Sequence, residues 1–129
     1  MKFEYVLDSG KFLPIISVQM KGLREWITFK AYIDTGASFC LFHADIAEAL
    51  GIKLEEGEKR EMILGDGDSI AVYLHKVSVK LAEREFIASI GFSQGLKIHF
   101  YIIGRQDIFD QFIICFHEKE KYIEFTPVT

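Results

Sequence analysis

The most informative segment of the sequence is Ala31-Tyr32-Ile33-Asp34-Thr35-Gly36-Ala37-Ser38. Residues 26–33 alternate between apolar and more polar side chains, which predicts a strand with one buried face. In this alternation Asp34 leaves the strand on the more polar side. Gly36 then permits a tight turn and the close approach of another backbone or a ligand. The stretch therefore predicts a carboxylate held firmly at the end of a buried strand.

Asp34 has two readings at this point. Asp34 either caps a turn at a strand end or acts as a catalytic carboxylate. The tripeptide Asp-Thr-Gly, taken alone, favours the turn cap. One carboxylate does little to a peptide bond. Two carboxylates that share a proton act as general base and general acid at once, because like charges about 3 Å apart cannot both ionise.

A second motif changes the balance between these readings: Tyr101-Ile102-Ile103-Gly104-Arg105-Gln106-Asp107-Ile108-Phe109. The two motifs, in this order, resemble the retropepsin family, the retroviral-type aspartic proteases and their cellular and prokaryotic relatives. In that family an apolar-apolar-Asp-Thr/Ser-Gly-Ala turn is backed by an apolar-apolar-Gly segment that leads into a short helix. The resemblance spans about Trp26 to Phe125.

The resemblance implies a role for each residue of the active-site turn. Asp34 is similar to the catalytic carboxylate, Thr35 to the residue that hydrogen-bonds across a dimer, and Gly36 to the residue whose backbone contacts substrate. Ala37 and Ser38 complete the turn.

The resemblance also assigns the segment behind that turn. Ile102, Ile103 and Gly104 are similar to its support. Arg105 stands where the family often has a basic residue, and the acidic partner of that residue is replaced here by Ser38.

Between the motifs, residues 62–73 form two β runs separated by glycine and aspartate. Asp-Gly between such runs predicts a hairpin in which glycine supplies the positive φ. A plain surface hairpin is one reading. The resemblance implies instead the flap that closes over substrate and excludes water, and the flanking motifs favour it. The expected flap residues are Gly65, Asp66, Gly67, Asp68 and Ser69.

Most of the remaining sequence alternates with period two and is rich in Val, Ile, Phe and Tyr, which predicts an all-β domain, a mainly antiparallel closed barrel with two short helices. The expected helices are His43 to Leu50, ended by Gly51, and Gln106 to Gln111 with Asp107 in its first turn. The expected strands are Phe3 to Leu7, Leu13 to Lys21, Trp26 to Ile33, Lys59 to Leu64, Ser69 to Leu81, Glu85 to Ile90, Ile98 to Ile103, Phe112 to Phe116 and Tyr122 to Phe125.

Composition narrows the class of protein. The length of 129 residues predicts one domain, residues 1–129, and the net charge of −4 offers no basic stripe for nucleic acid. The apolar runs fall short of the roughly 20 residues that cross a bilayer. The N-terminus carries an acid early and lacks the apolar segment of a secretion signal. We therefore expect a cytoplasmic protein without a membrane partner.

Cys40 and Cys115 are expected to be buried thiols, and the four histidines lack metal-ligand spacing, so neither a metal nor another cofactor is expected.

The sequence contains a second candidate for the active-site motif, Asp8-Ser9-Gly10, preceded by Val6 and Leu7. A two-lobed arrangement would need a complete lobe between Asp8 and Asp34, for which there is no room, so Asp8 is expected to be a turn residue.

Since one complete motif set exists, a carboxylate pair requires a homodimer with two-fold symmetry. The N-terminal strand and the two C-terminal strands are candidates for its interface.

These observations predict an aspartic endopeptidase, active as a homodimer, that uses a shared Asp34 dyad to hydrolyse an extended peptide or protein substrate. The alternative is a non-catalytic dimer of the same fold that clamps a peptide, and a purely structural dimer is a third, weaker reading. Specificity pockets are expected to be lined by apolar residues, with Ala37, Ile63, Ile70 and Val72 as candidates.

Overall fold

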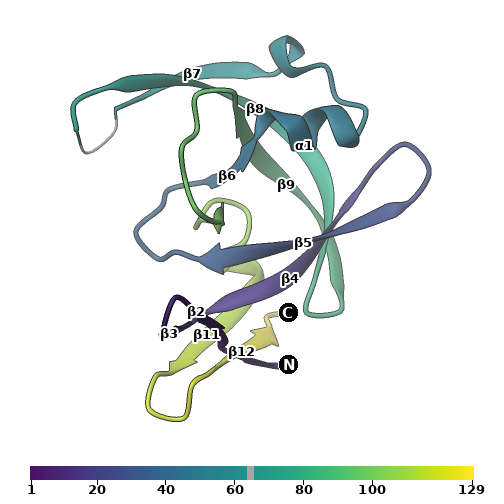
Figure 1. The fold of residues 1–129 in the computed structure, drawn as a ribbon. Coiled ribbons are helices and arrows are strands. Elements are labelled where there is room, and N and C mark those ends of the chain that lie inside the picture. Colours follow the sequence, from purple (N-terminus) through teal and green to yellow (C-terminus); the bar gives the residue numbers. More distant parts are fainter. Residues whose placement is uncertain (64–65) are drawn as a thin grey trace.

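The computed structural model describes residues 1–63 and 66–129, and it is built mainly of β-strands (Figure 1). Its helical elements are α1 (Ala44–Ala49) and two short 3₁₀ turns, η1 (Leu54–Glu56) and η2 (Phe109–Gln111). The strands are β1 (Lys2–Glu4), β2 (Val6–Asp8), β3 (Lys11–Leu13), β4 (Ile15–Lys21), β5 (Trp26–Ile33), β6 (Cys40–His43), β7 (Glu58–Ile63), β8 (Ser69–Leu81), β9 (Arg84–Ser93), β10 (Tyr101–Ile103), β11 (Phe112–His117) and β12 (Tyr122–Pro127). The expectation of an all-β chain with short helices is confirmed.

The main sheet has the strand order β4-β5-β10-β6-β9-β8-β7. β8 also pairs with β4, through Gln19 opposite Lys80 and Met20 opposite Val79, so the sheet closes on itself and β7 is left outside the ring. Two pairings are parallel, β5 with β10 and β6 with β9. The sequence did not indicate these parallel pairs, yet they place β10 beside the end of β5.

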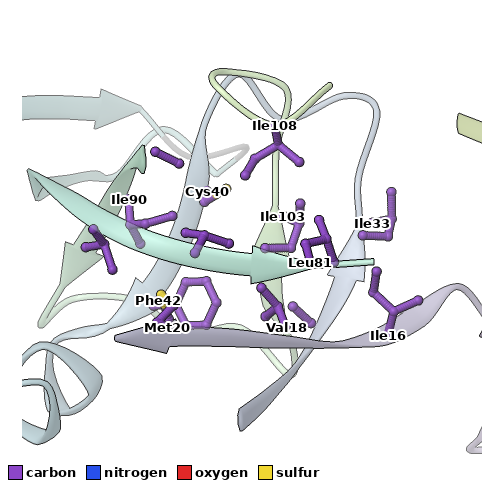
Figure 2. Close-up of a cluster of buried hydrophobic side chains, with 14 of the residues drawn as sticks. Ile16, Val18, Met20, Ile33, Cys40, Phe42, Leu81, Ile90, Ile103 and Ile108 are labelled. Atoms are coloured by element: carbon purple, nitrogen blue, oxygen red, sulfur yellow. The ribbon is translucent and has the colours of Figure 1, made fainter. Parts of the chain in front are cut away.

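The interior of this ring is packed with aliphatic and aromatic side chains from nearly every strand (Figure 2). Phe42, Ile90 and Ile103 are almost completely buried. Full burial of such a side chain stabilises the fold by roughly 1.5–3 kcal/mol. Cys40 lies in the same cluster, and desolvation raises the pKa of its thiol to about 12. This core fixes the strands on which the candidate site is built.

The buried thiol predicts a loss of stability at alkaline pH. The pKa of Cys40 rises from 9.0 to about 12 on folding, so the unfolded state loses its proton first as pH increases above 9. Between pH 9 and 12 the free energy of unfolding should therefore fall, by about 1.4 kcal/mol per pH unit for one group. Tyr5 adds to this trend, because desolvation and its hydrogen bond to Glu118 raise its pKa from 10.0 to about 12.

Urea unfolding of wild type and Cys40→Ala at pH 7, 9 and 10 in reducing buffer checks this expectation. Cys40→Ala should show the shallower fall with pH. The matched control is Cys115→Ala, because the Cys115 thiol is exposed. Equal slopes for both variants would show that Cys40 does not cause the alkaline loss.

A smaller sheet joins the two ends of the chain in the order β1-β12-β11. The rings of Phe3 and Phe112 both pack edge-on against Phe125, with centroids 5.7 and 5.3 Å away. β11 is an edge strand whose Ile113 and Phe116 remain 57% and 40% exposed. The expectation of two buried cysteines was wrong for Cys115, because it stands on the exposed side of this edge strand.

The N-terminal strands are shorter than expected. The predicted strand Phe3 to Leu7 is divided at Tyr5 between β1 and β2, and the strand expected from Leu13 to Lys21 is interrupted at Pro14, which has no N–H to donate. β2 and β3 form a separate hairpin whose turn, Ser9 and Gly10, has φ of 49° and 80°. Asp8 ends β2 immediately before this turn, as its assignment as a turn residue implied.

The first expected helix is confirmed as α1, and Gly51 follows it with φ of 76°. The second was wrong over most of its length, since only residues 109–111 form a 3₁₀ turn. Asp107 has φ of 64°, which an α-helix does not allow, and its Oδ2 accepts the backbone N–H of Ser89 at 2.8 Å. A bond to β9 has replaced the local helix.

Candidate active site

Asp34 is the first residue after β5, and backbone hydrogen bonds hold the strand end from two sides. The N–H of Ile33 donates to the carbonyl of Pro14, and the N–H of Asp34 donates to the carbonyl of Ile103, each at 3.0 Å. The second bond continues the parallel pairing of β5 with β10. The position of Asp34 is thus set by the barrel and by the segment expected to support it.

The carboxylate of Asp34 is oriented by its own turn. The N–H of Gly36 donates to Oδ1 at 2.8 Å, and the N–H of Ala37 donates to the Asp34 carbonyl at 3.3 Å. A Cβ at position 36 would lie 3.3 Å from Oδ1, a tight approach that glycine avoids. Asp34 is half-buried while Thr35, Gly36 and Ser38 are exposed, so a fixed carboxylate faces an accessible surface.

Gly104 brings the supporting segment against the turn at very close range. A Cβ at this residue would stand 2.5 Å from the carbonyl carbon of Phe39 and 2.9 Å from the carbonyl oxygen of Ala37. This contact is possible only without a side chain. Beyond it, the N–H of Arg105 donates to the Ala37 carbonyl at 3.0 Å and that of Gln106 to the Ser38 carbonyl at 2.8 Å. The structure therefore joins the two motifs that the sequence separates.

Two recesses meet at Asp34. We name the first, of about 290 Å³, the Phe116 recess, and the second, of about 600 Å³, the Phe100 recess. The Phe116 recess is lined by Phe12, Leu13, Pro14, Tyr32, Ile33, Asp34, Thr35, Phe116 and Glu118. The Phe100 recess is lined by Asp8, Ser9, Lys11, Leu13, Tyr32, Asp34, His99, Phe100 and Ile102. Asp34 thus has open space on both sides in which another chain can lie.

A family model described as aspartyl protease matches residues 16–89, more than half of the chain and the part that carries the Asp34 turn. The chain belongs to the aspartyl protease family. The sequence-based resemblance to the retropepsins is confirmed at this level.

Two solved structures of aspartic proteases have a fold similar to that of this chain. A retropepsin-like aspartic protease from Rickettsia conorii superimposes with a TM-score of 0.70 at 16% identity, over 96% of this chain and 98% of the other. The EIAV protease, solved in complex with the inhibitor HBY-793, gives 0.56 at 20% identity, over 81% and 92%. A comparison with curated proteins gave no match.

In this member of the aspartyl protease family, the expected flap falls on the β7–β8 hairpin, in which Ile63 is opposite Ser69. Gly67 has φ of 90°, as a hairpin glycine should, and the N–H of Asp68 donates to Oδ1 of Asp66 at 3.0 Å. Gly65, the first expected flap residue, lies outside the described residues, as does Leu64, the expected end of the preceding strand. The hairpin is present, and its role as a flap stays a prediction.

The expected pocket residues are only partly accessible. Val72 is fully buried in a cluster with Leu41 and Leu96, so its assignment to an open pocket was wrong. Ile63 is 78% exposed, and Ile70 packs against the same cluster as Val72. The apolar wall of the Phe100 recess beside Asp34 comes instead from Leu13, Tyr32, Phe100 and Ile102.

The sequence did not indicate the side chains that the β2–β3 hairpin contributes to the site. Asp8 and Lys11 line the Phe100 recess, and Oδ2 of Asp8 lies 3.5 Å from Nε2 of His99, which lines the same recess. A signal was available, because Ser9-Gly10 between Leu7 and Phe12 has the composition of a two-residue hairpin turn. Within residues 1–63 and 66–129, no group of three His, Cys, Asp or Glu side chains is arranged to hold a metal ion.

No helix in the described ranges is long and apolar enough to cross a bilayer.

Proposed function

We propose that residues 1–129 form one domain of an aspartic endopeptidase, active as a homodimer in which the Asp34 side chains of two copies form the catalytic dyad. The observation that supports the proposal best is the half-buried Asp34 carboxylate, held by the Gly36 N–H at 2.8 Å and backed by Ile103, at the meeting point of two recesses. Family membership supports the same reaction class.

The second carboxylate must come from another copy. Asp8 is the other aspartate of the Phe100 recess, but it lies at the end of a small hairpin and faces His99. Its turn has no Ile-Ile-Gly segment of its own. A two-fold axis beside the exposed Thr35 would place the two Asp34 turns face to face, which is the arrangement that a dyad needs.

The dyad carries a single proton, because two carboxyl groups about 3 Å apart cannot both ionise. The ionised Asp34 removes a proton from a water molecule while the water oxygen bonds to the scissile carbonyl carbon. The protonated Asp34 donates its proton to the leaving amide nitrogen, and the carbon–nitrogen bond breaks. The products are a carboxylic acid and an amine, and no covalent enzyme intermediate forms.

The substrate lies extended between the active-site turns and the β7–β8 hairpins, which act as flaps. Backbone hydrogen bonds to an extended peptide supply affinity, and side-chain pockets supply specificity. The Phe100 recess, with Tyr32, Phe100 and Ile102 in its wall, offers space for one substrate side chain next to Asp34. The ring planes of Tyr32 and Phe100 are 24° apart with centroids at 5.9 Å, so this wall is well packed.

The test is cleavage of reduced casein, an unstructured protein, across pH 3 to 8, with and without a pepstatin-type inhibitor. Cutting by wild type that the inhibitor blocks, and that is lost in Asp34→Asn, is the expected result. A dimeric wild type that binds casein fragments but does not cut at any pH would favour the peptide-binding clamp and contradict the proposal.

A further inference from the structure

Another cavity shares part of its wall with the Phe100 recess. It has a volume of about 410 Å³, and we call it the Lys30 cavity after a residue of β5 that lines it. His99 and Phe100 line both spaces, whereas Asp34 lines the Phe100 recess and not the Lys30 cavity. The Lys30 cavity is therefore a neighbour of the candidate active site and not a part of it.

The ionisable side chains at the wall of the Lys30 cavity are basic, apart from the phenol of Tyr101. They are Lys30, His43 at the end of β6, and His99 just before β10. None of the described residues that line the cavity is acidic, although the whole chain has a net charge of −4. The salt bridges among the described residues do not include Lys30, so its charge is not compensated there. The electrostatic complement of this cavity is an anion.

His43 is oriented by the residues that follow it. Its Nδ1 accepts the backbone N–H of Asp45 at 3.1 Å, and the Asp45 carboxylate lies 3.4 Å from the same nitrogen. Since Nδ1 is an acceptor, the neutral ring carries its proton on Nε2, which remains a donor. The cavity wall thus offers one ammonium group and one imidazole N–H to a ligand.

The rest of the wall is apolar or aromatic, and it consists of Ile15, Leu96, Ile98, Phe100 and Tyr101. The ring of Tyr101 stacks on that of the buried Phe42, with centroids 4.9 Å apart and planes at 18°, so this part of the wall is fixed by the core. A bare oxyanion such as phosphate would leave these surfaces unused. An anion with an apolar body would use both kinds of wall, and the single permanent charge of Lys30 matches one negative charge.

We propose that the Lys30 cavity binds a small organic monocarboxylate with a compact apolar body. The carboxylate accepts from Lys30 and His43, and the apolar body packs against the aliphatic and aromatic wall. The volume lies in the range of small-molecule sites, roughly 300–1,000 Å³. Because His99 and Phe100 also line the Phe100 recess, a bound ligand contacts a wall that the recess beside Asp34 uses. This inference does not depend on peptide cleavage.

NMR titration of isotope-labelled protein at pH 7 tests the proposal with phenylacetate, phenylethanol and phenethylamine, which share a ring and differ in charge. Phenylacetate should bind with a Kd on the order of 1 mM, as expected for so few atoms. The largest amide shift changes should fall in residues 96–101. The alcohol and the amine should bind about tenfold more weakly, and inorganic phosphate at the same concentration should not displace phenylacetate.

Two variants alter the cavity in different ways. Lys30→Met keeps an unbranched side chain and removes the charge, and Ile98→Asp adds a carboxylate at a wall residue that is 41% exposed. Each should raise the Kd of phenylacetate about fivefold or more. The matched controls Lys53→Met and Ile87→Asp change exposed residues that do not line the cavity, and they should leave the Kd unchanged. Thermal unfolding checks that each variant is folded, and if Ile98→Asp is not, Lys30→Met decides.

The titration is repeated with a saturating pepstatin-type inhibitor, and phenylacetate should still bind, since Asp34 does not line the Lys30 cavity. Displacement by the inhibitor would place phenylacetate in the Phe100 recess and overturn the inference. Equal affinity for phenylethanol, displacement by phosphate, or an unchanged Kd in Lys30→Met would overturn it as well. Because binding is measured directly, a failure to cleave casein would contradict the proposed function alone.

Discussion

Replacing Gly104 by alanine is expected to lower the free energy of unfolding by about 3 kcal/mol and to abolish cleavage. The new Cβ would stand 2.5 Å from the carbonyl carbon of Phe39 and 2.9 Å from the carbonyl oxygen of Ala37. Both are backbone atoms of the turn, so no side-chain rotation relieves the clash. The turn must move away, which breaks the hydrogen bonds from Arg105 to Ala37 and from Gln106 to Ser38.

Urea unfolding and casein cleavage measure the two effects of Gly104→Ala. At this chain length a loss of about 3 kcal/mol corresponds to a fall in Tm on the order of 10 °C. Gly10→Ala is the matched control, because a Cβ there has no neighbour within 4 Å and only its φ of 80° is unfavourable. That change should cost about 1 kcal/mol and leave cleavage in place. A Gly104→Ala protein as stable and active as Gly10→Ala would refute the tight packing of the two motifs.

Replacing Asp34 by asparagine is expected to lower kcat by about 10³-fold or more without destabilising the fold, since the loss of general acid–base catalysis has this order of magnitude. The asparagine side-chain oxygen can still accept the N–H of Gly36, so the turn keeps its shape. The variant should therefore remain a dimer with an unchanged Tm. Asp8→Asn, which alters the other aspartate of the Phe100 recess, should keep most of the activity.

Mixed dimers test the dyad more sharply than either variant alone. When wild type and Asp34→Asn are unfolded together and refolded in a 1:1 ratio, random pairing leaves about one quarter of the dimers with two aspartates. Activity should fall to that fraction of wild type. A fall to one half would mean that each Asp34 works alone, and it would contradict the shared carboxylate pair.

The active-site turn and its support could be predicted from the sequence because each is marked by a short motif that contains a glycine, and because the two motifs in this order resemble those of a known family. Gly36 and Gly104 mark places where a side chain has no room, and the structure shows backbone or carboxylate atoms at those places. The catalytic role of Asp34 stays a prediction, since its partner is not part of one chain.

The features that could not be predicted depend on contacts between distant residues. β6 has no polar alternation, because Cys40, Leu41 and Phe42 are all buried between two neighbouring strands. The helix expected at residues 106–111 was lost to the bond between Asp107 and the Ser89 amide. The accessibility of Cys115 depends on its place at the edge of a sheet, which periodicity alone does not reveal.

The bond from the Asp34 amide to the Ile103 carbonyl has a consequence for biosynthesis. Residues 34–38 leave the ribosome well before residues 103–106, which hold the turn in place. Since domains acquire their structure as synthesis proceeds from the N-terminus, a nascent chain carries Asp34 without the segment that positions it. The Asp34 carboxylate therefore lacks its backbone support until residues 103–106 have also been synthesised.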